Sequence, residues 1–141
     1  MVCRMGEVRI EVKLTNAVDL ALARRGHGEP AQARSCVAEA MVDTGAVRCV
    51  IPQHVADKLG AQTLRRKVVP YADGREEAVL ISEPILFEIM TREEEETAFI
   101  LGDEVLIGQT LLEKMDLHVD WLNRRLVSNP AHPDQPINKL K

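Results

Sequence analysis

The sequence predicts a single mostly-β domain of barrel-like type with two or three short helices. Short apolar segments, several of them alternating with charged residues, recur along the chain and are separated by turn signals. Candidate helices are few and short. Aromatic residues make up only 3% of the 141 residues, so Val, Leu, Ile and Ala must fill the core. A chain of this length can bury such a core without disulfides.

The first part of the chain begins with a clear strand pattern. Val8–Leu14 alternates apolar and charged residues, which is typical of a half-buried strand. The segment 16–26 is predicted as a short helix with Asn16 as its N-cap and Gly26 at its end. Three apolar residues of this segment also alternate, so a strand stays open as an alternative. A loop containing Gly28 and Pro30 follows.

The remaining elements follow from alternation, turn residues and helical spacing. Strands are predicted over 35–42, 47–51, 64–72, 75–81, 85–90, 97–101, 105–107, 118–121 and 125–127, and helices over 53–59 and 109–116. Pro52 and Gly60 flank the first of these helices, as start and stop signals do. Asp73-Gly74 predicts a two-residue hairpin turn, and the acidic run 93–96 predicts a solvated hairpin tip.

The domain is predicted to span residues 1–130, and a proline-containing tail spans 131–141. The formal net charge is −4 and no basic stripe with interleaved aromatics is present, so a nucleic-acid partner is not expected. No apolar run has the length of a membrane span, and the N-terminal residues lack a signal-peptide layout. We therefore expect a cytoplasmic protein without a membrane partner. The three cysteines have no metal-binding or CxxC spacing and are expected to be reduced thiols.

One motif carries potential chemistry. Asp43-Thr44-Gly45 directly follows an apolar strand, so the strand presents a carboxylate at its end. The Thr44 hydroxyl can lock the loop, and Gly45 lets another backbone or a substrate approach closely. The same three residue types also form ordinary turns, so the motif alone is a weak signal.

The surrounding segments strengthen this signal. Val105-Leu-Ile-Gly108 is an apolar-apolar-Gly pattern that precedes a helix, and a hairpin with Ala72-Asp-Gly74 at its tip lies between the two motifs. In this order the chain resembles the retropepsin-like aspartic proteases (clan AA), above all their small single-domain bacterial members. Those chains show a "VDTGA" strand end, an "ADG" flap tip and a terminal "LV…NP" strand. Here Val42–Ala46, Ala72–Gly74 and Leu126–Pro130 correspond to them, and the resemblance covers roughly residues 8–130.

The resemblance implies a closed β-barrel of the acid protease fold with one flap hairpin over the substrate. It implies that Asp43 is the catalytic aspartate, that Thr44 grips its counterpart across a dimer axis, and that Gly45 accepts the substrate backbone. The residues that would line or support the substrate site are Ala46, Tyr71, Ala72, Asp73, Gly74, Ile107 and Gly108. For Tyr71, an ordinary strand role is an equal alternative. No cofactor is implied.

The implied chemistry needs two carboxylates, whereas this chain contains one Asp-[Ser/Thr]-Gly. A monomer therefore supplies half of the pair, and a C2 homodimer supplies both Asp43 side chains. The resemblance is incomplete. Viral members carry an acidic residue after Asp-Thr-Gly-Ala and an arginine after the second glycine, where this chain has Val47 and Gln109. The proline-bearing tail also fits a terminal inter-subunit sheet poorly.

Other chemistries have weaker support. His27, His54, His118 and His132 are scattered without ligand spacing, so no metal site is expected. Cys36 and Cys49 lie in apolar strand contexts, which favours buried thiols over nucleophiles. We therefore expect a homodimeric aspartic endopeptidase that cleaves extended peptides or unfolded segments. The alternative is a catalytically weak or silent module of the same fold that dimerises or binds peptides.

Overall fold

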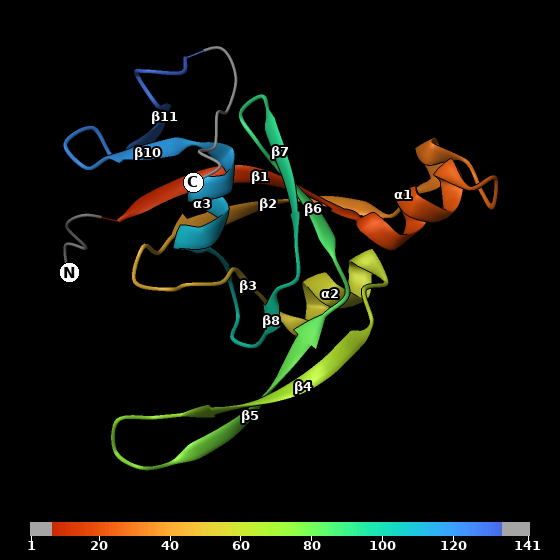
Figure 1. The fold of residues 1–141 in the computed structure, drawn as a ribbon, viewed down its shortest axis with the longest axis horizontal. Coiled ribbons are helices and arrows are strands. Elements are labelled where there is room, and N and C mark those ends of the chain that lie inside the picture. Colours follow the sequence, from red (N-terminus) through yellow and green to blue (C-terminus); the bar gives the residue numbers. More distant parts are fainter. Residues whose placement is uncertain (1–6, 134–141) are drawn as a thin grey trace.

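The computed structural model describes residues 7–133 and consists mostly of β-strands (Figure 1). Cys3, the N-terminal residues and the tail beyond residue 133 lie outside the described residues. The elements are β1 Val8–Asn16, α1 Ala17–Arg24, a 3-10 turn Pro30–Gln32, β2 Ser35–Val42, β3 Val50–Ile51, α2 Gln53–Leu59, β4 Thr63–Pro70, β5 Glu76–Ser82, β6 Ile85–Ile89, β7 Arg92–Glu96, β8 Phe99–Ile100, β9 Val105–Ile107, α3 Gln109–Met115, β10 Leu117–Asp120 and β11 Arg125–Ser128.

Nine strands form one sheet in the order β4-β5-β8-β3-β9-β2-β1-β6-β7, and β10 pairs with β11 separately. The pairs β2–β9 and β3–β8 are parallel, and the other pairs are antiparallel. The expected closed barrel is wrong, because β4 and β7 are open edges. Closure needs a continuous staggered ladder, and β3 and β8 have only two residues each. Both edges carry charge: β4 holds three consecutive cations and β7 four glutamates, which discourages edge-to-edge pairing.

The core lies on one face of this sheet and is aliphatic, as predicted. Phe87 is the one aromatic residue of the buried cluster among residues 7–133. The helices α2 and α3 bury Leu59, Leu111 and Met115 in the same cluster. Strand residues of this cluster come mainly from β1, β2, β6 and β9: Val8, Val12, Leu14, Ala40, Val42, Ile85, Phe87, Ile89, Val105 and Ile107.

The helix boundaries confirm the sequence prediction. The Asn16 side chain accepts a hydrogen bond from the Asp19 backbone N–H over 2.9 Å, so α1 is an N-capped helix and the open strand alternative is wrong. The helix α2 ends at Gly60, which takes the left-handed conformation with φ +63°. The helix α3 ends in the same way at Asp116, with φ +57°.

The acidic run was predicted as a hairpin tip, and this prediction is wrong. The turn lies before the acidic run, at Met90 and Thr91, and Met90 takes φ +58°. The run itself forms strand β7, which pairs with β6 from Ile89↔Arg92 to Ile85↔Glu96. Arg92 is 5% exposed and donates to the backbone carbonyls of Met115, Asp116 and His132. This buried arginine fixes the strand, so the glutamates can occupy an edge.

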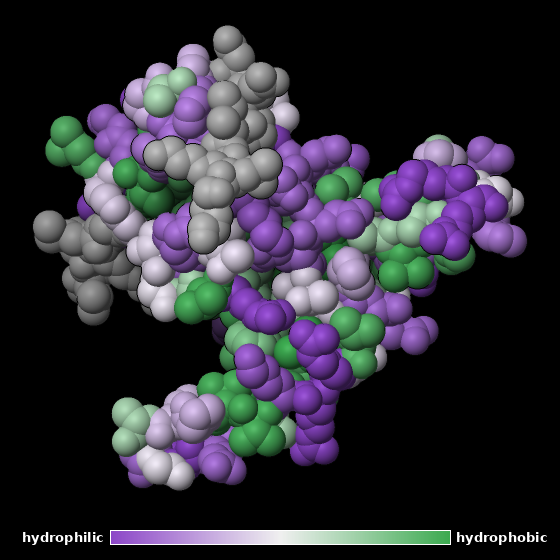
Figure 2. Space-filling model, in the orientation of Figure 1, coloured by the Kyte–Doolittle hydropathy of each residue, from purple (hydrophilic) through white to green (hydrophobic). Residues whose placement is uncertain are grey.

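The predicted β4–β5 hairpin is confirmed and extends away from the body of the molecule (Figure 1). Its turn is wider than the predicted two residues. Tyr71 N–H donates to the Arg75 carbonyl over 2.8 Å, and Gly74 N–H donates to the Tyr71 carbonyl over 3.0 Å. Figure 2 shows an open hollow between this hairpin and the rest of the molecule. Within residues 7–133, no helix has the length and apolar character of a membrane span.

Candidate active site

The Asp-Thr-Gly turn lies where β2 ends beside the end of β9. The two strands are parallel, and their last pair is Val42↔Ile107. The backbone N–H of Asp43 donates to the Ile107 carbonyl over 2.9 Å. The ladder therefore continues by one residue past the strand and holds Asp43 next to Gly108.

The turn orients the carboxylate of Asp43. Gly45 N–H donates to Asp43 Oδ1 over 3.0 Å, and Ala46 N–H donates to the Asp43 carbonyl over 3.0 Å. A Cβ atom at Gly45 would lie 3.2 Å from Oδ1, which is tight. Asp43 is half-buried, whereas Thr44 and Gly45 are exposed. In the described part of the chain the Thr44 hydroxyl has no hydrogen-bond partner.

Gly108 lies directly beneath the loop that follows the turn. A Cβ atom there would lie 2.6 Å from the Arg48 carbonyl carbon, 2.7 Å from its oxygen and 2.9 Å from the Ala46 carbonyl oxygen. The first amides of α3 complete this contact. Gln109 N–H donates to the Ala46 carbonyl over 2.8 Å, and Thr110 N–H donates to the Val47 carbonyl over 3.1 Å. The loop thus rests on the backbone that joins β9 to α3.

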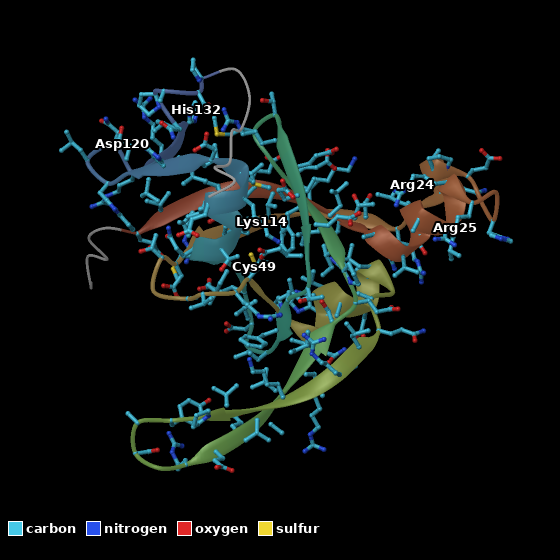
Figure 3. All side chains as sticks on the ribbon, viewed as in Figure 1. Arg24, Arg25, Cys49, Lys114, Asp120 and His132 are labelled. Carbon is cyan, nitrogen blue, oxygen red and sulfur yellow. The ribbon has the colours of Figure 1, made fainter. Side chains whose placement is uncertain are left out.

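Cys49, at the end of the loop that follows the Asp43 turn, lies in the interior of the molecule (Figure 3). Its Sγ accepts from Gly108 N–H over 3.4 Å, and its side chain is fully buried. Burial raises the pKa of the Cys49 thiol to about 12. Burial also raises the pKa of the half-buried Cys36. Both thiols are free and protonated near neutral pH, so neither is an activated nucleophile.

The strand register brings further residues to the face of the sheet opposite the core. Side chains alternate along a strand, so Asp43 lies on the same side as Met41, whereas Val42 enters the core. Residues paired across strands share a face, and following the pairs from Met41 leads to Leu106, Val50, Phe99 and Ile81. Met41, Leu106 and Phe99 are half-buried, whereas Val50 and Ile81 are buried. These five apolar residues are not among the site residues that the sequence predicts. Counting back two residues from Asp43 could have found Met41, but the others depend on register.

The hairpin tip stands apart from the turn. Tyr71, Ala72, Asp73 and Gly74 are exposed, and no hydrogen bond joins them to residues 43–46 in the described region. The Tyr71 hydroxyl donates to Glu77 over 2.5 Å, which raises the pKa of Tyr71. The Arg75 guanidinium lies 5.0 Å from the Tyr71 ring centroid and bonds to Asp73 over 2.6 Å. The tip is therefore ordered by contacts within the hairpin.

The two positions that depart from the viral pattern carry no ion pair at the turn. Val47 is 71% exposed, and Gln109 Nε2 donates to Glu113 Oε1 over 3.2 Å within α3. Among residues 7–133, no three His, Cys, Asp or Glu side chains gather as metal ligands would. A groove of about 580 Å³ lies between β1, the β6–β7 turn and β11, and Asp43 does not line it. The candidate site is therefore defined by the Asp43 turn rather than by cavity size.

Comparison with known proteins gives a likeness at the level of structure only. Neither a protein-family model nor a curated protein matches the sequence. The solution structure of simian foamy virus (mac) protease is similar with a TM-score of 0.48 and 13% identity, over 74% of this chain and 90% of that chain. EIAV protease complexed with the inhibitor HBY-793 is similar with a TM-score of 0.44 and 15% identity, over 55% of this chain and 75% of that chain. These values do not assign the chain to a family, so the case for a function rests on the Asp43 turn itself.

Proposed function

We propose that the protein is a homodimeric aspartic endopeptidase, as the resemblance in its sequence implies. The observation that carries this proposal is the placement of Asp43. Its backbone is fixed to Ile107 and its Oδ1 to Gly45, yet the turn around it is exposed. A carboxylate that is oriented by the backbone and open to a partner is what a shared catalytic pair requires.

The reaction would use the two Asp43 carboxylates of a dimer. Two carboxylates about 3 Å apart share one proton, which is an established property of aspartic-protease dyads. The ionised group takes a proton from a bound water while the protonated group polarises the scissile carbonyl. The water oxygen then attacks the carbonyl carbon, and the amine leaves with a proton. The step needs neither an acyl-enzyme nor a metal ion, and no cofactor is proposed.

Several features of the turn suit a C2 interface. Thr44 is exposed and its hydroxyl has no partner within residues 7–133, so it can bond to the partner subunit. Val47, on the same loop, is 71% exposed and offers apolar surface for burial. Gly45 and Ala46 would then face substrate beside Asp43, with Ile107 and Gly108 as support. A cytoplasmic location remains part of the proposal.

The substrate would be an extended peptide or unfolded segment. Such a peptide would lie between the β4–β5 hairpin and the face that carries the half-buried Met41, Leu106 and Phe99. The hollow beside the hairpin is open in the single chain (Figure 2), so the hairpin could cover a peptide as a flap. Residues 71–74 would then contact the bound peptide.

The alternative is a module of similar fold that dimerises or binds peptides without turnover. It is favoured by Val47 and Gln109, because neither supplies the charges that support viral dimers and their substrates. A weak dimer would leave Asp43 without its counterpart at low concentration.

The test is digestion of an unfolded protein between pH 3 and 8 by the native chain and by Asp43→Asn. Asparagine keeps the shape of the side chain and removes the acid. We expect cleavage by the native chain alone, rising more steeply than linearly with enzyme concentration. Equal cleavage by both chains would refute the assignment of Asp43. No cleavage by a chain that sizing shows to be dimeric would favour the binding module.

A further inference from the structure

Arg48 places a cation beside the candidate active site. Its Cζ atom lies 5.7 Å from the centroid of the Phe99 ring, and its Nη1 donates to Thr97 Oγ1 over 2.8 Å. Phe99 pairs with Val50, and both belong to the face of the sheet that Asp43 shares. The guanidinium therefore lies next to a residue of the face that Asp43 shares.

The charge of Arg48 is not neutralised within the described region. No carboxylate of residues 7–133 lies within ion-pair distance of it, whereas the neighbouring Glu96 pairs with Lys114 over 3.2 Å. A guanidinium carries five N–H donors, and Thr97 accepts from one nitrogen. Arg48, Lys114, Glu96, Val47, Thr97 and Thr110 line a pocket of about 250 Å³. The Lys114–Glu96 pair thus accounts for the carboxylate of this pocket, and Arg48 has no ion pair within residues 7–133.

The backbone of Arg48 is held more firmly than an exposed loop would be. Gly108 packs against its carbonyl group so closely that a Cβ atom would lie 2.6 Å from the carbonyl carbon. The amide of Thr110 bonds to the preceding carbonyl, that of Val47. The backbone at Arg48 is therefore fixed, and the contacts with Thr97 and Phe99 orient its side chain, which lowers the entropic cost of binding a partner.

We infer that Arg48 recognises an acidic side chain of the substrate; this inference rests on the proposed function. A carboxylate can accept two parallel hydrogen bonds from a guanidinium, a geometry that neutral side chains do not reproduce. Each subunit of a C2 dimer presents one Arg48. Acidic residues are therefore expected on both sides of the cleaved bond, at similar distances from it.

Glu96 supplies the competing possibility. Its Oε1 is buried and has no hydrogen-bond partner among residues 7–133. A carboxamide could donate to this oxygen if the side chain turned outward, and glutamine or asparagine would then be preferred over an acid. The two outcomes are distinguished by comparing carboxylate and carboxamide at one substrate position.

The experiment sequences the cleavage products of a denatured protein mixture after digestion by the native chain, Arg48→Met, Arg48→Glu and Arg24→Glu. Arg24 lies at the end of α1, away from Cys49 (Figure 3), and serves as the control for a charge change. We expect Asp and Glu to be enriched on both sides of the cleaved bond for the native chain and Arg24→Glu. Arg48→Met should lose this enrichment, and Arg48→Glu should favour Lys and Arg.

A matched peptide pair then measures the effect. At the enriched position, glutamate should give a kcat/KM about tenfold higher than glutamine with the native chain, and the ratio should approach one in Arg48→Met. This ratio is internal to each variant, so a loss of folded protein does not affect it. An unchanged cleavage profile in Arg48→Met, or a preference for glutamine, would overturn the inference. If no chain cleaves, the proposed function fails, and binding of the same two peptides by Asp43→Asn decides the role of Arg48.

Discussion

The backbone N–H of Asp43 and the carbonyl of Ile107 lie 2.9 Å apart, and this hydrogen bond joins the candidate catalytic turn to the strand that leads into α3. The next residue after Ile107 is Gly108, whose Cα faces the loop. The position of the carboxylate therefore depends on backbone contacts from a segment more than sixty residues away in the sequence. Substitutions at this contact should affect activity and stability together.

Gly108→Ala tests this dependence. The added methyl group would lie 2.6 Å from the Arg48 carbonyl carbon and 2.9 Å from the Ala46 carbonyl oxygen, so the loop must move. We expect a loss of about 1–3 kcal/mol in the free energy of unfolding, measured with urea, and loss of endopeptidase activity. Gly102→Ala is the control, because nothing lies within 4 Å of its Cβ position although its φ is +74°. It should cost about 1 kcal/mol and keep its activity. Full activity in Gly108→Ala would show that the loop does not position Asp43.

Arg92→Met tests the buried arginine that fixes β7. The substitution removes the donors to the carbonyls of Met115, Asp116 and His132 while keeping an unbranched apolar side chain. Because buried carbonyls would be left without partners, we expect a loss of about 3 kcal/mol in urea unfolding. Arg65→Met, on the exposed strand β4, should change stability by less than about 0.5 kcal/mol. Similar effects of the two substitutions would contradict the structural role of Arg92.

The sequence predicts local elements well where the signal is local. The helix α2 has the predicted bounds because Pro52 and Gly60 mark both ends. The acidic run 93–96 led to the wrong prediction of a hairpin tip. The residue that fixes β7 is Arg92, and its partners lie in α3 and after β11. Arginine buried among carbonyls leaves no periodic signal, so the run of glutamates dominates the pattern.

The candidate site shows the same division between local and long-range information. The turn from Asp43 to Gly45 and the hairpin tip are short motifs that can be found in the sequence. The apolar face beside them depends on the register of five strands, including β3 and β8 with two residues each. Two residues do not show an alternation, so Val50 and Phe99 could not be assigned to this face. The open edges of the sheet also could not be predicted, because the closure of a barrel depends on which strands pair and not on how many strands the chain has.

Cys49 should make stability depend on pH in the alkaline range. In the unfolded chain a thiol ionises near pH 9.0, whereas burial in the fold raises the pKa of Cys49 to about 12. Between these values the unfolded state releases a proton that the folded state keeps, so stability falls as pH rises. We expect the native chain to lose about 1.4 kcal/mol per pH unit above pH 9 relative to Cys49→Ala. Urea unfolding of both chains at pH 8, 9 and 10 measures this difference, and parallel curves would contradict the burial of the thiol.

Mixing the native chain with Asp43→Asn tests whether one catalytic pair is shared between two subunits. If subunits exchange freely and both chains fold alike, an equal mixture contains about one quarter native homodimers by random pairing. The mixture should then show about one quarter of the activity of native chain at the same total concentration, because a mixed dimer carries only one acid. Subunits that act independently would give about one half instead. The control is Arg24→Glu, which alters an exposed residue of α1 and should leave the activity of the mixture equal to that of the native chain. A value near one half at a concentration where sizing shows exchanging dimers would mean that each Asp43 works alone, and the dyad chemistry would have to be abandoned.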